Sequence, residues 1–216
     1  MKTDADISRD VESELRWDPS INDTRIGVTV SNGVVTLTGD VPNYSDRWAA
    51  DDITKRVGGV RAIANDVQVK IPLSGVRTDT DIAEAAANTL QWNVSLSHTE
   101  IKPVVKDGWI TLSGQVSWGY QCVAAENAVR HLMGVKGVTN DICVASNIKA
   151  SNVKQKIEDA FKRHAILDAK DIEVNVDSST VILKGHVHSW QERADASLAA
   201  WAAPGVLAVE NRLAIQ

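Results

Sequence analysis

The chain repeats itself three times, and this repetition limits its fold more than any other feature. One seven-residue block recurs at offsets of 75 and 71 residues, as Val35–Val41, Ile110–Val116 and Val181–Val187. A second block recurs at the same two offsets, as Gly59–Asn65, Gly134–Asn140 and Gly205–Asn211. Because two separate blocks keep one register, each copy is expected to be one structural unit without internal insertions.

The periodicity of the first copy predicts the order helix, strand, strand, helix, strand. Apolar residues at positions 7, 11 and 15 share one face of a helix. Residues 26–30 and 35–41 alternate as half-buried strands do, with the hairpin pair Asn32-Gly33 between them. A second helix is predicted over residues 44–57, ended by Gly58-Gly59, and a third strand near residues 65–71. The other copies carry Asp107-Gly108 and Ser178-Ser179 at the hairpin.

These patterns predict an α+β fold of three tandem αββαβ domains. Each domain is expected to hold a three-stranded mixed sheet with two helices on one face. The predicted domains are residues 1–71, 77–146 and 151–216. A unit of about 70 residues buries only a modest core, so neighbouring copies are expected to support one another.

Composition and motifs argue against several classes of function. The formal net charge of -5 disfavours a nucleic-acid partner. No catalytic or nucleotide-binding motif is found, so we expect no enzyme and no cofactor. Two cysteines and the pair His186/His188 do not complete a metal ligand set, so we expect solvent-facing histidines and no metal. No transmembrane segment or signal peptide is recognised, which predicts a cytoplasmic protein, or a periplasmic one if an N-terminal signal was removed.

The repeated unit resembles the BON domain, named after a bacterial osmotically inducible protein and nodulation proteins. The motifs that carry the resemblance are the Gly-x-Val pairs at Gly39, Gly114 and Gly185, and the blocks that run from Gly59 to Asn65, Gly134 to Asn140 and Gly205 to Asn211. The resemblance covers nearly the whole chain. The resemblance implies a non-catalytic, transport-associated bacterial module. Such a module is associated with envelope maintenance, with osmotic stress and with phospholipid surfaces.

Two recurrent residue types are interpreted as structural. One is an asparagine expected just before strand three of each copy, at Asn65, Asn140 and Asn211. Its side-chain amide can form hydrogen bonds with nearby backbone groups and so fix where the strand starts. Trp17 and Trp92 recur at the end of the first helix, where we expect each ring to close the core.

The candidate contact surfaces are places where one copy departs from the others. Leu198 and Trp201 lie on the outward side of the third copy's second helix, where the first copy has Asp52 and Lys55. Trp109, with Val104 and Cys143, is expected on the outer face of the second copy's sheet. The lysines of the third copy's first helix form a candidate membrane surface, made of Lys154, Lys156 and Lys162.

The leading functional hypothesis is therefore a binding and scaffold protein that associates with anionic phospholipid surfaces. One alternative is a sensor of a small ligand or ion, with its site between domains. The other is a chaperone-like protein that uses its apolar faces. Self-association and contact with another protein are the alternative partners.

Overall fold

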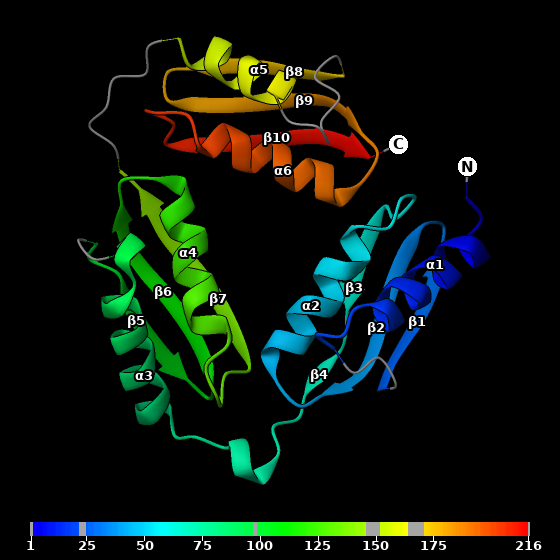
Figure 1. Cartoon of the computed structure of the whole chain (residues 1–216), viewed down its shortest axis with the longest axis vertical. Coiled ribbons are helices and arrows are strands. Elements are labelled where there is room, and N and C mark those ends of the chain that lie inside the picture. Colours follow the sequence, from blue (N-terminus) through cyan, green and yellow to red (C-terminus); the bar gives the residue numbers. More distant parts are fainter. Residues whose placement is uncertain (1, 22–24, 97–98, 146–151, 164–170, 216) are drawn as a thin grey trace. The chain divides into compact units, whose positions relative to one another are not determined.

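A computed structural model describes residues 2–21, 25–96, 99–145, 152–163 and 171–215. The chain forms two compact units. Figure 1 labels the helices and strands along it. The first comprises Met1–Val76, His188–Gln191 and Ile215–Gln216, and the second comprises Arg77–Val187 and Glu192–Ala214.

The first copy contains two helices and a sheet whose third strand is interrupted. Its elements are α1 (Asp4–Trp17), β1 (Ile26–Ser31), β2 (Val34–Val41), α2 (Tyr44–Lys55), β3 (Ala62–Asn65) and β4 (Gln68–Val69). β1 pairs antiparallel with β2, while β3 and β4 both pair parallel with β2. The sheet is therefore mixed, as the sequence predicted.

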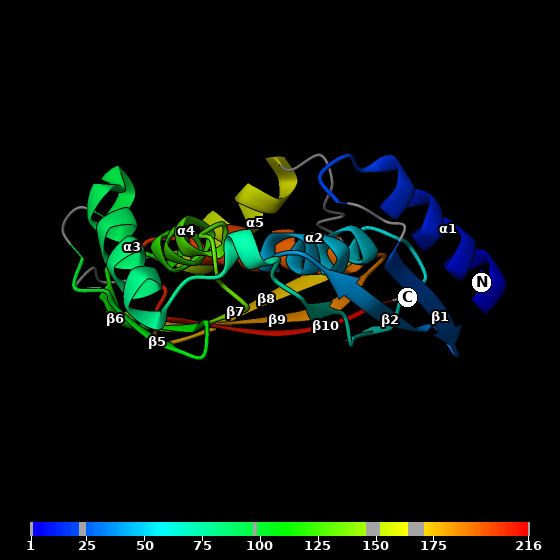
Figure 2. The ribbon, with the colours of Figure 1, turned by 90° about the horizontal axis from the view of Figure 1, so that it is seen from below.

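The second and third copies repeat this order. The second contains η2 (Leu73–Gly75), α3 (Asp79–Trp92), η3 (Val94–Leu96), β5 (Lys102–Lys106), β6 (Trp109–Val116), α4 (Gly119–Arg130) and β7 (Gly137–Val144). The third contains α5 (Val153–Arg163), β8 (Ile172–Asp177), β9 (Thr180–Val187), α6 (Trp190–Trp201) and β10 (Ala208–Ile215). Their sheets run β5-β6-β7 and β10-β9-β8. In each copy the helices cover one face of the sheet (Figure 2).

The predicted fold class is confirmed, with two shifts of element boundaries. Helix α2 ends at Lys55, two residues before the predicted end. The third strand begins at Ala62, so Asn65 lies within it and not before it. The β2–β3 ladder already starts at the pair Val34 and Ala62, and cross-strand hydrogen bonds decide where a strand begins. The domain limits 1–71, 77–146 and 151–216 stay a prediction.

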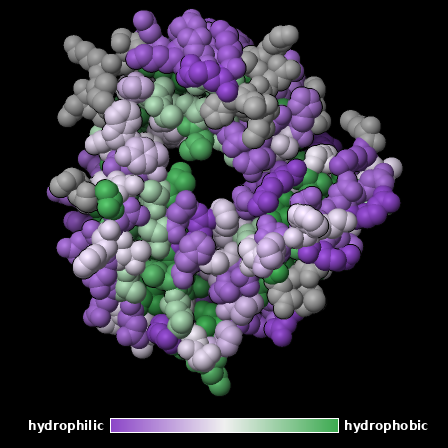
Figure 3. All heavy atoms as spheres, viewed as in Figure 1, coloured by the Kyte–Doolittle hydropathy of each residue, from purple (hydrophilic) through white to green (hydrophobic). Residues whose placement is uncertain are grey.

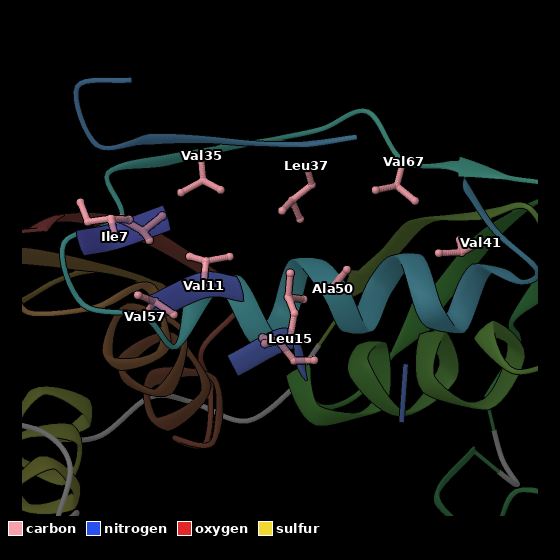
Figure 4. Packing of buried hydrophobic residues seen from close by; sticks show 11 residues of the cluster. Ile7, Val11, Leu15, Val35, Leu37, Val41, Ala50, Val57 and Val67 are labelled. Carbon is pink, nitrogen blue, oxygen red and sulfur yellow. The ribbon is translucent and has the colours of Figure 1, made fainter. Parts of the chain in front are cut away.

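The core of the first copy lies between its sheet and its helices. Ile7, Val11 and Leu15 of α1 face Val35 and Leu37 of β2, and all five are almost completely buried (Figure 4). Leu37 and its counterparts Leu112 and Leu183 are each 0% exposed. The three copies therefore bury the same positions, and the i, i+4, i+8 spacing of α1 marks its inner face.

The glycines of the repeated motif are required by the backbone. Gly39, Gly114 and Gly185 have φ of +116°, +133° and +121°, a region that other residues rarely adopt. A Cβ atom on Gly114 would lie 2.1 Å from the carbonyl oxygen of Glu100. Gly59, Gly134 and Gly205, which follow the second helix, also have positive φ. A side chain would be strained at all six positions.

A carboxylate at the start of the first helix holds the hairpin in two copies. Asp4 accepts hydrogen bonds from the backbone N–H groups of Asn32 and Gly33, at 2.7 and 2.8 Å. Asp79 makes the same pair of bonds, both at 2.8 Å, to Asp107 and Gly108. The first helix and the β-hairpin of these copies are thus joined by charge-assisted bonds.

Candidate functional site

The recurrent asparagine joins the second helix to the third strand in every copy. Asn140 donates from Nδ2 to the carbonyl oxygen of Cys122 on α4 at 2.8 Å, and its Oδ1 accepts from the N–H of Ile142. Asn65 and Asn211 make the equivalent bonds to Arg47 and Arg193. These bonds fix the strand against the helix and leave the amide little freedom to bind a ligand.

The lysines of α5 are exposed, and two of them lie beside acids. Lys154 lies 3.8 Å from Glu158, and Lys162 lies 3.4 Å from Asp159. Lys156 is also exposed, while Val153, Ile157 and Phe161 are buried beneath the helix. Exposed ion pairs of this kind are weak, so the lysines can turn to other anions.

The expectation that Trp17 and Trp92 close the core was wrong. Their exposed fractions are 82% and 84%. Trp17 follows the buried Leu15 by two residues, which turns it to nearly the opposite side of a helix with 3.6 residues per turn. Trp92 follows the buried Leu90 in the same way. In the view of Figure 3, hydrophilic residues cover most of the visible face and hydrophobic ones are exposed between them.

The three apolar residues singled out by the repeat comparison differ in their surroundings. Leu198 is 50% exposed, whereas Trp201 is half-buried. Trp109 is 43% exposed, but its indole nitrogen donates to Thr139 at 2.8 Å and its ring lies over Gly137 of the neighbouring strand. Trp109 therefore already has a partner in its own sheet.

A cavity of about 470 Å³ lies within the second compact unit. Its walls come from α4, β7, α6 and the start of β10 with the residue before it. They consist of Gly119, Cys122, Val123, Asn140, Ile142, Cys143, Val144, Leu198, Trp201, Leu207, Ala208 and Val209. Burial raises the pKa of the Cys122 thiol, with a further contribution from Cys143 against an opposing backbone hydrogen bond. The Cys122 thiol is therefore protonated near neutral pH, and no Asp, Glu, Lys or Arg is among the wall residues.

The sequence placed Leu198, Trp201 and Cys143 at candidate contact surfaces, but it did not identify the α4 residues Gly119 and Cys122 that complete the wall opposite α6. Gly119 and Cys122 are small residues without a catalytic motif. The signal that could have found them is their difference from the other copies. The first copy has Tyr44 and Arg47 at these two positions, and the third has Trp190 and Arg193.

Neither a metal cluster nor a membrane span is found in the described parts of the chain. In those ranges no three His, Cys, Asp or Glu side chains gather closely enough to hold a metal ion. His186 and His188 are both exposed. No helix among the described residues is both long and apolar enough to cross a bilayer.

Comparison with known proteins gives one family and several relatives. The profile of the BON domain matches residues 3–71, 78–146 and 149–216. A 21 kDa hemolysin of Actinobacillus pleuropneumoniae is 31% identical over 54% of this chain and 60% of its own length, which is less than two thirds of that relative. The osmotically-inducible protein Y of Escherichia coli (strain K12) is 28% identical over 64% of this chain and 71% of its own length. The outer membrane lipoprotein DolP of Haemophilus influenzae is 28% identical over 59% of this chain and 67% of its own length.

Proposed function

This chain belongs to the BON domain family, and we propose on that premise that it is a non-catalytic bacterial binding and scaffold protein of envelope or osmotic-stress physiology. Its proposed activity is reversible association with anionic phospholipid headgroups at the periphery of the envelope. The names of two relatives support this proposal, since one is an osmotically-inducible protein and the other is an outer membrane lipoprotein.

The charge of α5 is the observation that carries the phospholipid proposal. This helix has four basic residues, Lys154, Lys156, Lys162 and Arg163, and two acidic ones. The equivalent helix α1 has five acids and two arginines, and α3 has three acids and no base. Among the first helices of the three copies, α5 therefore has the only positive excess in its described sequence. A basic residue close to an anionic membrane contributes about 1 kcal/mol.

The exposed indoles of Trp17 and Trp92 support a second, apolar contribution. Tryptophan partitions to the interface between lipid and water, where its ring is buried and its N–H stays hydrated. Both rings lie on helices with an excess of acids, so anionic headgroups do not attract these helices. Their contribution to membrane binding is therefore expected to be insensitive to salt.

Flotation of the full chain with vesicles tests the proposal. We expect association with vesicles that contain an anionic lipid, weaker association with zwitterionic vesicles, and a decrease as salt rises. The triple change Lys154→Gln, Lys156→Gln, Lys162→Gln removes three charges, so it should weaken binding by at most about 3 kcal/mol, or on the order of 100-fold. The matched control changes the exposed Lys70, Lys102 and Lys106 to Gln and alters net charge equally.

The control should retain most of the binding if the basic surface lies on α5. Equal loss in both triple variants would show that only net charge matters. Binding that survives the α5 change and high salt would refute an electrostatic mechanism through this helix. In that case the double change Trp17→Ala, Trp92→Ala identifies an apolar contact, provided that the variant keeps the melting temperature of the unaltered chain.

A further inference from the structure

One wall of the cavity in the second unit lacks an arginine that both other copies have at the equivalent position. In the first copy Arg47 donates from Nη2 to the carbonyl oxygen of Asn65 at 3.1 Å. In the third copy Arg193 donates from Nη2 to Asn211 at 2.8 Å and from Nε to Leu213 at 3.2 Å. Both guanidinium groups thus lie along the edge of the third strand.

Cys122 occupies the corresponding position of α4. The carbonyl groups that correspond to those of Asn211 and Leu213 belong to Asn140 and Ile142, and both residues line the cavity. The Cys122 sulfur lies 3.8 Å from the carbonyl oxygen of Ile142, so the thiol provides at most a weak hydrogen bond there. The second copy therefore keeps the acceptors of the guanidinium site while lacking the guanidinium.

A second pair of substitutions shapes the same cavity. Gly119 begins α4, where the other copies have Tyr44 and Trp190. The ring of Trp201 lies directly against this glycine, because a Cβ atom placed there would be 2.7 Å from the indole. The glycine thus provides the space that the indole occupies as part of the cavity wall.

Aromatic and acidic groups beside the cavity suit a planar cation. A guanidinium stacks well on the face of a tryptophan, and Trp201 forms part of the wall. Glu126, one helical turn beyond Cys122, is half-buried, and its carboxylate lies 3.4 Å from Nδ2 of Asn140. The first copy also has an acid at this position, Asp51, whereas the third copy has Ser197. The second copy therefore keeps a carboxylate here but lacks the arginine that the first copy also has.

We propose that this cavity binds a guanidinium group from outside the chain, in the place that an arginine side chain takes in the other two copies. The carbonyl oxygens of Asn140 and Ile142 accept its N–H groups, and Trp201 stacks on its plane. The guanidinium belongs to a small free molecule or to an arginine of a peptide. This inference does not depend on phospholipid association.

Titration of the full chain with N-acetylarginine amide tests the site. The readouts are the backbone amide resonances of Asn140 and Ile142 and the indole N–H resonance of Trp201. The indole resonance is assigned by its loss in the Trp201→Phe variant. We expect saturable shifts in the millimolar range, typical of a small ligand with few contacts. The neutral citrulline analogue should give none. Absence of saturable shifts up to about 50 mM, or equal shifts with citrulline, would overturn the proposal.

Two variants at one position separate loss of the site from loss of the fold. Cys122→Arg supplies the guanidinium internally, so it should abolish the shifts and raise the melting temperature. Cys122→Ala should keep the shifts, because the thiol has no role in binding. Retained binding in Cys122→Arg contradicts the proposal. If Cys122→Arg does not fold, Trp201→Lys, which introduces the first-copy residue, should weaken binding at least fivefold, and unchanged affinity would be contrary evidence.

A last comparison identifies the source of the guanidinium. A short peptide with one internal arginine between apolar residues is titrated beside N-acetylarginine amide. At least tenfold tighter binding of the peptide assigns the site to an arginine side chain of a partner. Equal affinity assigns it to a small free molecule, and both results support a guanidinium site.

Discussion

The carboxylate of Asp79 is expected to stabilise the second copy by joining α3 to the β5–β6 hairpin. Asp79→Ala removes both hydrogen bonds to the N–H groups of Asp107 and Gly108, each 2.8 Å long. It also removes a negative charge from the first turn of α3, where the helix dipole favours one. The third copy has Ala150 at the equivalent position, which lies outside the described residues, and alanine has no carboxylate to accept these hydrogen bonds.

The expected cost follows from the exposure of this carboxylate. A hydrogen bond to a charged group contributes about 1.5 to 3 kcal/mol when well shielded. Asp79 is exposed and water can replace it, so we take about 1 kcal/mol for each bond. The charge at the helix start contributes a further 0.3 to about 1 kcal/mol. The sum of about 2 to 3 kcal/mol corresponds to a change of roughly 30- to 150-fold in an opening equilibrium.

Native-state amide hydrogen exchange measures this change copy by copy. In Asp79→Ala the β6 amides of Ile110 and Leu112 should exchange faster by that factor, while the β9 amide of Leu183 should change little. Asp141→Ala, which removes another exposed acid of the same copy, is the control. Unchanged β6 exchange would refute the assigned role, and an equal effect on β9 would refute its restriction to one copy.

Two further predictions concern the repeated core and the helix starts. Leu37→Ala, Leu112→Ala and Leu183→Ala should each cost about 2 to 5 kcal/mol in chemical unfolding, because all three side chains are completely buried; near-neutral values would reject a shared core. Hydrogen bonds from Thr3 and Thr78 lower the pKa of Asp6 and Asp81 below the ordinary 3.8. The two ionised carboxylates therefore contribute their full stabilisation above pH 3.8, and this stabilisation is lost as the pH falls through the lowered pKa values. Carboxyl resonances of Asp6 and Asp81 titrating at or above pH 3.8 would contradict this.

The fold could be predicted because buried positions leave a direct mark on the sequence. The inward residues of α1 recur every four positions, and the same positions recur in the next two copies. Boundaries were less accurate, because the β2–β3 ladder and not the apolar pattern decides that strand three starts at Ala62. Trp17 was misplaced because its size suggested burial, whereas its distance of two residues from Leu15 places it outside.

The guanidinium site illustrates a kind of feature that a search for gained residues overlooks. Comparison of the copies identified Leu198 and Trp201 because a large apolar residue replaces a polar one, and such a change suggests a contact. At Cys122 the second copy instead loses an arginine, and at Gly119 it loses an aromatic ring. Neither loss has a meaning until the structure shows that Arg47 and Arg193 bind carbonyl groups of strand three and that Trp201 lies on Gly119. Because the acceptors are backbone atoms, which every sequence has, no motif could have revealed them. In a repeat protein, a position where one copy alone loses a hydrogen-bonding side chain is therefore a candidate for a ligand that replaces that side chain.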